Sequence, residues 1–440
     1  MYRVNAPAVY VEDLVAKNPA YMTKVDRVVA ALENPVEPVI YTEGDLPDLM
    51  ANGLMSGRGI MGDKEMVRDP ALLFNTFKFD GQRQARLDRL AAAGVEKPSR
   101  LDEVLGHTAF YWANYNQEGD HARNDKVCRP CWRVHQQRGC LHKCTYCSLG
   151  GLLTVGVNTD EYCHWFGKLM EKHPWQLTYL LDDDADPPGL EPELGCLGEL
   201  IEWFGTLENR YLIIHTKTWN TEWMRDLKHN GNTILVWSVT SPTQSQLIEP
   251  DTGTTDQRIE AARIAQEAGY QIRYKFKPIV PVKGWREDAA YTAKRIFERT
   301  NPDVITLCTF MWTHFKDLPG KLPLDLLDPE FLAAAEAAQE EMSQTLTRPF
   351  PPQVRAEIYR HHLQEIRRWD KDIPVSLSTE SFSLWKEIGE EFGYKANNYP
   401  CGCGPFTVPG APKVECNPFT VPHRADNGEI PGCMPPFRKA

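Results

Sequence analysis

The sequence lacks any apolar run long enough to cross a bilayer, which argues against a membrane-spanning helix. Its first residues, MYRVNAP, lack the apolar stretch of a secretory signal peptide, so we expect a cytoplasmic protein that does not act at a membrane. Basic residues are also fewer than acidic ones, since the chain has 49 Lys and Arg but 60 Asp and Glu. The net charge of −11 argues against a nucleic-acid partner without excluding a local basic groove.

The chain is, by contrast, well supplied with cysteine and with the apolar residues of a folded core. Its 440 residues contain 42% hydrophobic and 25% charged residues, which is typical of a globular protein with one large domain and additions. Twelve cysteines without an export signal indicate reduced thiols or metal ligands instead of disulfides. Three of them, Cys163, Cys196 and Cys308, lie in apolar surroundings and are expected in the core.

The most informative motif is the triplet Cys140-Leu-His-Lys-Cys144-Thr-Tyr146-Cys147. Three thiolates spaced C-x3-C-x2-C on one loop can hold three irons of a 4Fe–4S cluster and leave the fourth iron open, whereas electron-transfer clusters are closed by four cysteines. A zinc site or unrelated core thiols are the alternatives, although zinc sites more often use paired C-x2-C units. With an aromatic residue before the last cysteine, the pattern resembles the radical S-adenosylmethionine (SAM) superfamily.

After the triplet, short apolar runs alternate with helical patterns, which predicts an α/β fold with a parallel sheet. Because the triplet loop comes at the start of this series, we expect a partial (β/α) barrel of the radical SAM type. Ligands of such a sheet bind at the carboxyl ends of the strands. The strands are expected at 176–181, 211–215, 233–237, 271–280, 303–310 and 374–378, and the helices at 194–204, 221–229, 256–268, 287–299 and 384–391.

We expect three regions along the chain. Residues 1–127 form a mixed N-terminal region with a strand at 38–41 and a helix at 83–93, and residues 128–395 form the partial barrel. Residues 396–440 are a tail rich in Cys, Pro and Gly without periodicity. Such a segment buries too little apolar surface to order itself, so it often needs a metal or disulfide.

Further motifs resemble the spore photoproduct lyase family over residues 5–395, with gaps. They are Thr216-Lys217, Asn220, His229-Asn230-Gly231, Trp237-Ser238-Val239, Ile248-Glu249-Pro250, the stretch from Gln257 to Arg263, Ala268-Gly269-Tyr270, Pro278-Ile279 and Gly284-Trp285. Val9 to Glu12 and Ser378 to Ser381 extend the match toward both ends.

This resemblance implies a 4Fe–4S cluster on Cys140, Cys144 and Cys147 whose open iron binds SAM. A reductant such as flavodoxin or ferredoxin would supply the electron that cleaves SAM to a 5′-deoxyadenosyl radical. The resemblance also implies that Lys217 and Ser238 contact the amino-acid end of SAM, and we place Tyr146 among the cofactor-binding residues. Lys217 and Ser238 sit at the carboxyl ends of expected strands, and an ammonium there suits a carboxylate.

The sequence departs from the family after the first strand of the series. The lyase carries a hydrogen-donating cysteine there, whereas this chain reads Leu181-Asp-Asp-Asp-Ala-Asp186. Asp183 and Asp184 are therefore our candidate catalytic residues, since acids at the cofactor edge can hold ribose hydroxyls or a cationic substrate. The alternative is a solvated acidic loop. Because the donor thiol is missing, we expect no repair of spore photoproduct.

The tail supplies a second candidate metal site. Cys401, Cys403, Cys416 and Cys433 provide four ligands that could close an auxiliary iron–sulfur cluster or bind zinc, and the pair Cys128-Arg-Pro-Cys131 could contribute. The alternative is a disordered tail with idle thiols.

Three functions remain in competition. The first is a radical SAM enzyme of lyase or oxidoreductase type that abstracts hydrogen from an unidentified small-molecule or peptide substrate. The second is DNA photolesion repair with a variant donor such as Cys196 or a tyrosine, which would require a flipped lesion. The third is a non-catalytic iron–sulfur or zinc protein with a closed site.

Overall fold

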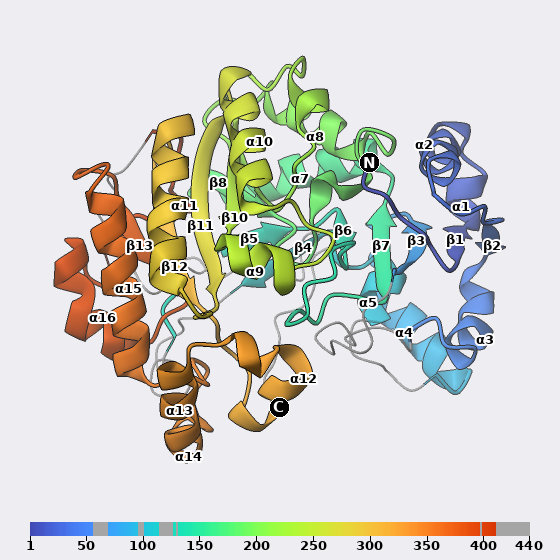
Figure 1. The fold of residues 1–440 in the computed structure, drawn as a ribbon. Coiled ribbons are helices and arrows are strands. Elements are labelled where there is room, and N and C mark those ends of the chain that lie inside the picture. The colour runs from blue at the N-terminus through green and yellow to red at the C-terminus, as the bar shows by residue number, and fades with distance from the viewer. Residues whose placement is uncertain (56–68, 96–100, 114–125, 129–130, 397, 411–440) are drawn as a thin grey trace.

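The computed structural model describes residues 1–440 except 56–68, 96–100, 114–125, 129–130, 397 and 411–440 (Figure 1). The described chain forms two sheets, one of eight strands and one of five. Most of the buried apolar side chains join one large cluster around the eight-stranded sheet. Among the described residues, no helix has both the length and the apolar character needed to traverse a bilayer.

The eight-stranded sheet carries the predicted series of parallel strands. Its order is β13-β12-β11-β10-β9-β8-β5-β4, and every neighbouring pair is parallel except β4 with β5. The end strands β13 and β4 each have one neighbour, so the described sheet is open, as a partial barrel requires. The predicted α/β class is confirmed. The strands are β4 (Phe110–Ala113), β5 (Cys131–Val134), β8 (Thr178–Leu181), β9 (Tyr211–Thr216), β10 (Thr233–Val239), β11 (Gln271–Ile279), β12 (Ile305–Thr309) and β13 (Val375–Leu377).

Helices connect successive strands and cover the outer face of this sheet. In Figure 1, α10 and α11 stand in front of the central strands, and α15 and α16 lie beyond them toward β13. The inner strands are buried along their length, which is why they read as continuous apolar runs in the sequence. The helices of this layer are α7 (Thr159–Lys172), α8 (Cys196–Phe204), α9 (Pro242–Leu247), α10 (Thr255–Glu267), α11 (Trp285–Arg299), α15 (Pro352–Arg367) and α16 (Phe382–Ile388).

Local sequence signals set the ends of α10. The Thr254 hydroxyl accepts from the Gln257 backbone N–H at 3.3 Å, and the Gln257 side chain accepts from the Thr254 N–H at 2.9 Å, which closes a capping box. Gly269 follows the helix with φ of +93°, a left-handed conformation that ends helices and favours glycine.

The helix predicted at 221–229 is wrong. That segment forms only the 3₁₀ turn η3 (Glu222–Met224), followed by further i to i−3 hydrogen bonds. A Cβ on Gly205 would come within 2.1 Å of the Lys228 carbonyl oxygen. The close approach of these two backbones therefore sets the path of the segment, and the helical periodicity of its side chains does not.

The five-stranded sheet lies beside the first. Its order is β2-β1-β3-β7-β6, and only β6 with β7 is antiparallel. β6 and β7 come from the triplet region, while β4 from the N-terminal region joins the large sheet. The boundary predicted at residue 127 therefore does not separate the two sheets. The strands are β1 (Val9–Glu12), β2 (Val39–Tyr41), β3 (Ala71–Asn75), β6 (Gln137–Arg138) and β7 (Leu152–Gly156).

Short elements complete the fold. Beside the five-stranded sheet lie α1 (Asp13–Ala16), α2 (Pro19–Ala30), α3 (Leu46–Ala51), α4 (Arg83–Ala92) and α5 (Leu101–Val104), and after β12 come α12 (Leu318–Lys321), α13 (Pro329–Ala337) and α14 (Gln339–Met342). The other 3₁₀ turns are η1 (Glu43–Asp45), η2 (Pro187–Leu190), η4 (Phe315–Asp317), η5 (Leu324–Leu326) and η6 (Gly389–Phe392).

The first part of the tail, residues 401–410, packs against the inner side of the large sheet. The buried Arg273 guanidinium on β11 donates to the carbonyl oxygens of Thr407 and Val408, both at 3.0 Å. The Gly410 N–H donates to Asp303 at 2.9 Å, and the Leu177 N–H donates to the Pro405 carbonyl at 2.9 Å. The tail segment is therefore held by the sheet and does not need a core of its own.

Candidate active site

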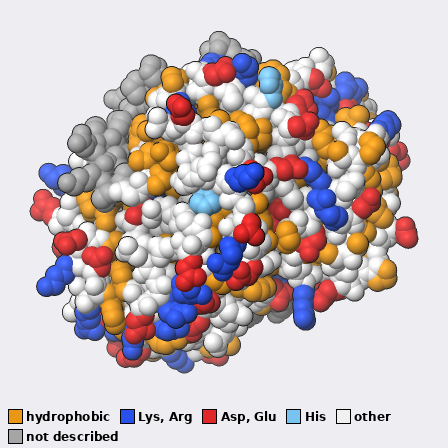
Figure 2. Space-filling model, turned by 90° about the horizontal axis from the view of Figure 1, so that it is seen from above, with side chains coloured by type: hydrophobic (Ala, Val, Ile, Leu, Met, Phe, Trp, Pro, Cys, Tyr) orange, Lys and Arg blue, Asp and Glu red, His pale blue; other side chains and the backbone are white. Residues whose placement is uncertain are grey.

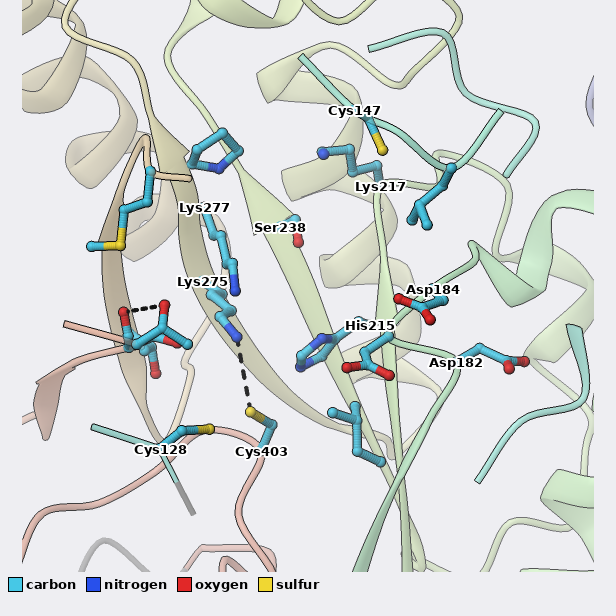
Figure 3. A pocket seen from close by; sticks show the side chains of 18 of the residues that line it. Cys128, Cys147, Asp182, Asp184, His215, Lys217, Ser238, Lys275, Lys277 and Cys403 are labelled. Atoms are coloured by element: carbon cyan, nitrogen blue, oxygen red, sulfur yellow. Dashed lines mark hydrogen bonds between the residues drawn. The ribbon is translucent and has the colours of Figure 1, made fainter. Parts of the chain in front are cut away.

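A cavity of about 460 Å³ opens at the carboxyl ends of the parallel strands. Residues at or just after the ends of successive strands line it, and Figure 3 shows their side chains converging on one space. This is where the parallel topology predicts a ligand. The strand residues are Asp182 after β8, Thr216 and Lys217 at β9, Ser238 on β10, Lys277 on β11, Phe310 after β12 and Ser378 after β13.

The cysteine triplet forms one end of the cavity. Cys140, Cys144 and Cys147 all line it, and the first two are at least nine-tenths buried. The loop is held at both ends, since the Cys140 N–H donates to Leu149 O and the Thr145 N–H donates to Ile248 O, both at 3.0 Å. No group of three or more described His, Cys, Asp or Glu side chains could hold a single metal ion. Three thiols spread along one loop facing one cavity fit a cluster of several irons better.

A buried ion network sits directly behind the triplet. Glu249 is fully buried and pairs with the buried Arg258 guanidinium at 2.6 Å. Its other oxygen accepts from the Tyr146 hydroxyl and lies 3.6 Å from the Lys217 ammonium. Burial opposes ionisation of this carboxyl, but the positive charges of Lys217 and Arg258 outweigh it and lower the pKa to about 2. Glu249 is therefore a fixed anion that orients Tyr146 and Lys217.

The three predicted cofactor-binding residues come together around this network. Lys217 Nζ lies 3.0 Å from the Tyr146 hydroxyl and 3.9 Å from Cys144 Sγ. Ser238 lies further into the cavity, between Lys217 and Lys277 (Figure 3). Tyr146 and Lys217 thus lie beside the triplet and Ser238 lines the same cavity, while their role in binding SAM stays a prediction.

The acidic loop after β8 is engaged by partners on neighbouring elements. The fully buried Asp182 carboxylate accepts from the Gln136 N–H at 3.0 Å, and burial raises its pKa. Asp183 pairs with Arg133, and Asp184 pairs with Arg138. All three carboxylates line the cavity, so the loop is not a freely solvated acidic segment. The catalytic role of Asp183 and Asp184 stays a prediction.

Asp186, the last acid of this loop, ties the triplet to β9. Its carboxylate contacts His142 of the triplet loop at 2.6 Å, and it accepts from the Thr216 hydroxyl at 2.7 Å and the Lys217 N–H at 2.8 Å. Burial opposes ionisation, but the His142 contacts and these hydrogen bonds lower its pKa. Asp186 therefore fixes Lys217 relative to the triplet.

A second group of thiols lies at the other end of the same cavity. Cys128, Cys401 and Cys403 line it together with His215 and Lys275. Lys275 Nζ lies 3.8 Å from Cys403 Sγ (Figure 3). A hydrogen bond from Cys401 lowers the pKa of Cys403 against the opposing effect of burial, and Lys275 lowers it further. Cys416 and Cys433, the other predicted tail ligands, lie outside the described residues.

Sequence reasoning missed several residues of this site. Glu249 and Arg258 were noted only as parts of motifs that resemble the family. His215, Lys275 and Lys277 were not singled out at all. The alternation of β11 carried a signal: Arg273, Lys275 and Lys277 are two apart, so all three face the same side of a strand whose other side is apolar.

Comparisons with known proteins agree with this geometry. The family model "Spore photoproduct lyase" matches residues 132–315. The spore photoproduct lyase of Bacillus subtilis (strain 168) is 29% identical over 181 residues, which are 39% of this chain and 52% of the relative. That of Geobacillus sp. (strain Y412MC61) is 30% identical over 156 residues, or 34% and 46% of the two chains. The chain thus matches about half the length of these curated relatives.

Solved structures show the same fold over a longer stretch. A spore photoproduct lyase variant with bound AdoMet and dinucleoside spore photoproduct has a TM-score of 0.57 at 16% identity, covering 86% of this chain and 99% of that one. A spore photoproduct lyase complexed with dinucleoside spore photoproduct has a TM-score of 0.56 at 16% identity, covering 85% and 98%. The family resemblance and the fold expected from the motifs are confirmed.

Proposed function

We propose that this chain, a member of the spore photoproduct lyase-like family of radical SAM proteins, is a radical SAM enzyme. Cys140, Cys144 and Cys147 would hold a 4Fe–4S cluster that, when reduced by a flavodoxin or ferredoxin, cleaves bound SAM to a 5′-deoxyadenosyl radical. The observation that carries this proposal is the placement of the triplet, Lys217 and Ser238 around one cavity at the carboxyl ends of the strands. A closed electron-transfer or zinc site would not need an open cavity beside its thiols.

The residues beside the triplet are suited to hold the amino-acid end of SAM. An ammonium has three N–H donors. That of Lys217 donates to the Tyr146 hydroxyl, forms an ion pair with Glu249 and lines the cavity. The fixed charge of Glu249 keeps this lysine in place before ligand arrives, and Ser238 adds a hydroxyl further into the cavity. Asp183 and Asp184 would act next to the substrate, oriented by their arginine partners.

The comparisons favour nucleic-acid photolesion repair over the unidentified substrate that the sequence led us to expect, and they count against the expectation that the missing thiol rules out repair of spore photoproduct. The relatives are named for spore photoproduct, and two solved neighbours hold a dinucleoside form of it. The cavity offers a matching surface: Lys277 Nζ lies 4.9 Å from the ring centre of Trp312, whose exposed fraction is 42%. A cationic and aromatic wall suits an anionic, base-containing substrate. We therefore propose a lesion-bearing dinucleotide as the substrate class.

Anaerobic cleavage of SAM tests the enzyme proposal. Reconstituted protein, reduced with dithionite and incubated with SAM, is expected to form 5′-deoxyadenosine, which is measured by liquid chromatography. Cys144→Ala should form none. Cys163→Ala is the matched control, because Cys163 is a buried thiol on α7 outside the cavity. Equal product from wild type and Cys144→Ala would refute the proposal.

Conversion of the lesion tests the substrate class separately. Dinucleoside spore photoproduct added to the same reaction should yield two thymidines at a rate comparable with SAM cleavage. SAM cleavage without any thymidine would leave the enzyme class standing and reject this substrate.

A further inference from the structure

The tail delivers two thiols to the cavity on a single tight turn. Residues 401–404 read Cys-Gly-Cys-Gly and lie against the inner face of the large sheet. Cys403 packs beside Leu180, Ile213 and Val236, and its sulfur is directed at Lys275 (Figure 3). The triplet occupies the opposite end of the same cavity. The two thiols therefore face the space where a substrate would bind.

The residue between the two cysteines packs closely on the sheet. A Cβ on Gly402 would come within 2.8 Å of the Thr306 hydroxyl oxygen on β12. The turn therefore lies against β12, and the two cysteines are one residue apart on it and both line the cavity. Thiols separated by one residue on a tight turn lie within the span that a disulfide can bridge.

Cationic and polar groups surround Cys403 on the cavity side. The Lys275 ammonium is 3.8 Å from its sulfur, and the buried His215 side chain also interacts with it. An adjacent ammonium stabilises a thiolate, and the thiolate is the reactive form of cysteine. Cys163, the buried thiol used above as a control, differs in this respect, because burial raises its pKa to about 12.

We propose that Cys401 and Cys403 form a redox-active dithiol that faces the substrate cavity. The Cys403 thiolate attacks a small disulfide such as glutathione disulfide and releases one thiolate. The Cys401 sulfur then attacks the mixed disulfide, loses its proton and releases the second thiolate. One disulfide bond forms in the protein, one breaks in the oxidant, and two electrons pass to glutathione.

The reduced pair would also serve as a hydrogen donor for the proposed radical SAM enzyme, a role that rests on the proposed function. The acidic loop after β8 contains no cysteine, whereas Cys401 and Cys403 line the cavity and would be able to give a hydrogen atom to a substrate radical there. Transfer of one hydrogen atom breaks the S–H bond of Cys401 and forms a C–H bond on the substrate. The sulfur radical left behind bonds to the adjacent Cys403 thiolate as a disulfide radical anion. Loss of its extra electron to an external acceptor such as oxidised flavodoxin or ferredoxin leaves the Cys401–Cys403 disulfide, which two electrons and two protons return to the dithiol.

A metal site on the same cysteines is the competing interpretation. The sequence predicted one with Cys416 and Cys433, which lie outside the described residues. Lys275 occupies a hydrogen-bonding position on the Cys403 sulfur. An ammonium in that position competes with a metal for the thiolate.

Redox titration with mass mapping tests the dithiol. Reconstituted wild-type protein is equilibrated in glutathione buffers of increasing potential, quenched with an alkylating agent and digested with trypsin. The peptide covering 396–413 contains only these two cysteines. We expect it to lose the mass of two hydrogens and to escape alkylation as the potential rises, while Cys163 stays reduced throughout.

Two variants at Lys275 test the role of its charge. In reduced protein, Lys275→Met should slow alkylation of Cys403 about tenfold or more, because the thiolate fraction falls. Lys275→Arg keeps the charge and should retain most of the rate. The inference is overturned if no disulfide forms in any buffer, if Lys275→Met reacts as fast as wild type, or if Cys403→Ser releases zinc or additional iron. Formation of 5′-deoxyadenosine, measured on the same preparation, shows separately whether the proposed function holds.

Discussion

Replacement of Glu249 by Gln is expected to destabilise the protein strongly. The carboxylate is fully buried and is the counter-ion of both Arg258 and Lys217. Gln has a similar shape but no charge, so two buried cations would lose their anion. Breaking a buried ion pair by removing one partner typically costs about 3–5 kcal/mol. Proton linkage gives a similar magnitude, because a carboxyl whose pKa falls from 4.5 to about 2 on folding contributes about 3 kcal/mol of stability at neutral pH.

The sign of the pH dependence follows from the same shift. Because the pKa of Glu249 is lowered by folding, its contribution is fully present above pH 4.5 and is lost as the pH falls toward about 2. Glu249→Gln should therefore lose this part of the acid dependence. Urea denaturation of wild type and variant, followed by tryptophan fluorescence at pH 7 and at lower pH, measures both effects.

Glu391→Gln provides the matched control. Glu391 also pairs with an arginine, Arg360 at 2.7 Å, but both side chains are more than 40% exposed. Exposed pairs contribute about 0–1 kcal/mol, so this variant should unfold nearly as wild type does. If Glu249→Gln were as stable as Glu391→Gln, the buried network would not hold Lys217 and Tyr146 in the way inferred above.

Three further variants probe the cavity and the tail. Lys217→Ala should weaken SAM binding by about 1.5–3 kcal/mol while the cluster still assembles, as judged by calorimetry and iron content; an unchanged dissociation constant removes Lys217 from the site. Burial and the neighbouring Lys275 lower the pKa of Lys277 to about 8, with Lys126 adding to this and Cys308 and Cys403 opposing it. The dissociation constant of an anionic dinucleotide should rise up to about tenfold per pH unit above 8, and Lys277→Met should abolish this dependence. Gly402→Ala should lower the free energy of unfolding by about 1–3 kcal/mol and make residues 401–410 more sensitive to protease, as measured by limited proteolysis. Gly320→Ala should change neither, because a Cβ there meets no neighbour within 4 Å.

The parallel sheet and the triplet site could be predicted because their signals are local. Strands such as β9 and β10 are largely apolar and buried, and the place of Lys217 and Ser238 near the strand ends agrees with the role that the family resemblance implies for them. The cysteine spacing is fixed within one loop, so no long-range information is needed to read it.

Other features depend on contacts between distant segments. The helix predicted at 221–229 fails because packing of Lys228 on Gly205 overrides periodicity. The strands β6 and β7 join the N-terminal sheet although they lie beyond residue 127 in sequence.

The surroundings of the tail thiols also depend on contacts between segments that are distant in sequence. Cys403 and Lys275 are separated by 128 positions, and no spacing rule in the sequence links them. The sequence indicated that the tail cysteines needed a partner, but only the folded chain places an ammonium and the cavity beside them.

Electron paramagnetic resonance of the reduced cluster tests the central claim most directly. Reconstituted protein, reduced with dithionite, is measured with and without SAM. If Cys140, Cys144 and Cys147 leave one iron open, SAM should bind there and change the shape and g-values of the cluster signal. Cys144→Ala should show no such cluster signal. A wild-type signal that SAM leaves unchanged at saturating concentration would mean that the site is closed, and would contradict the account.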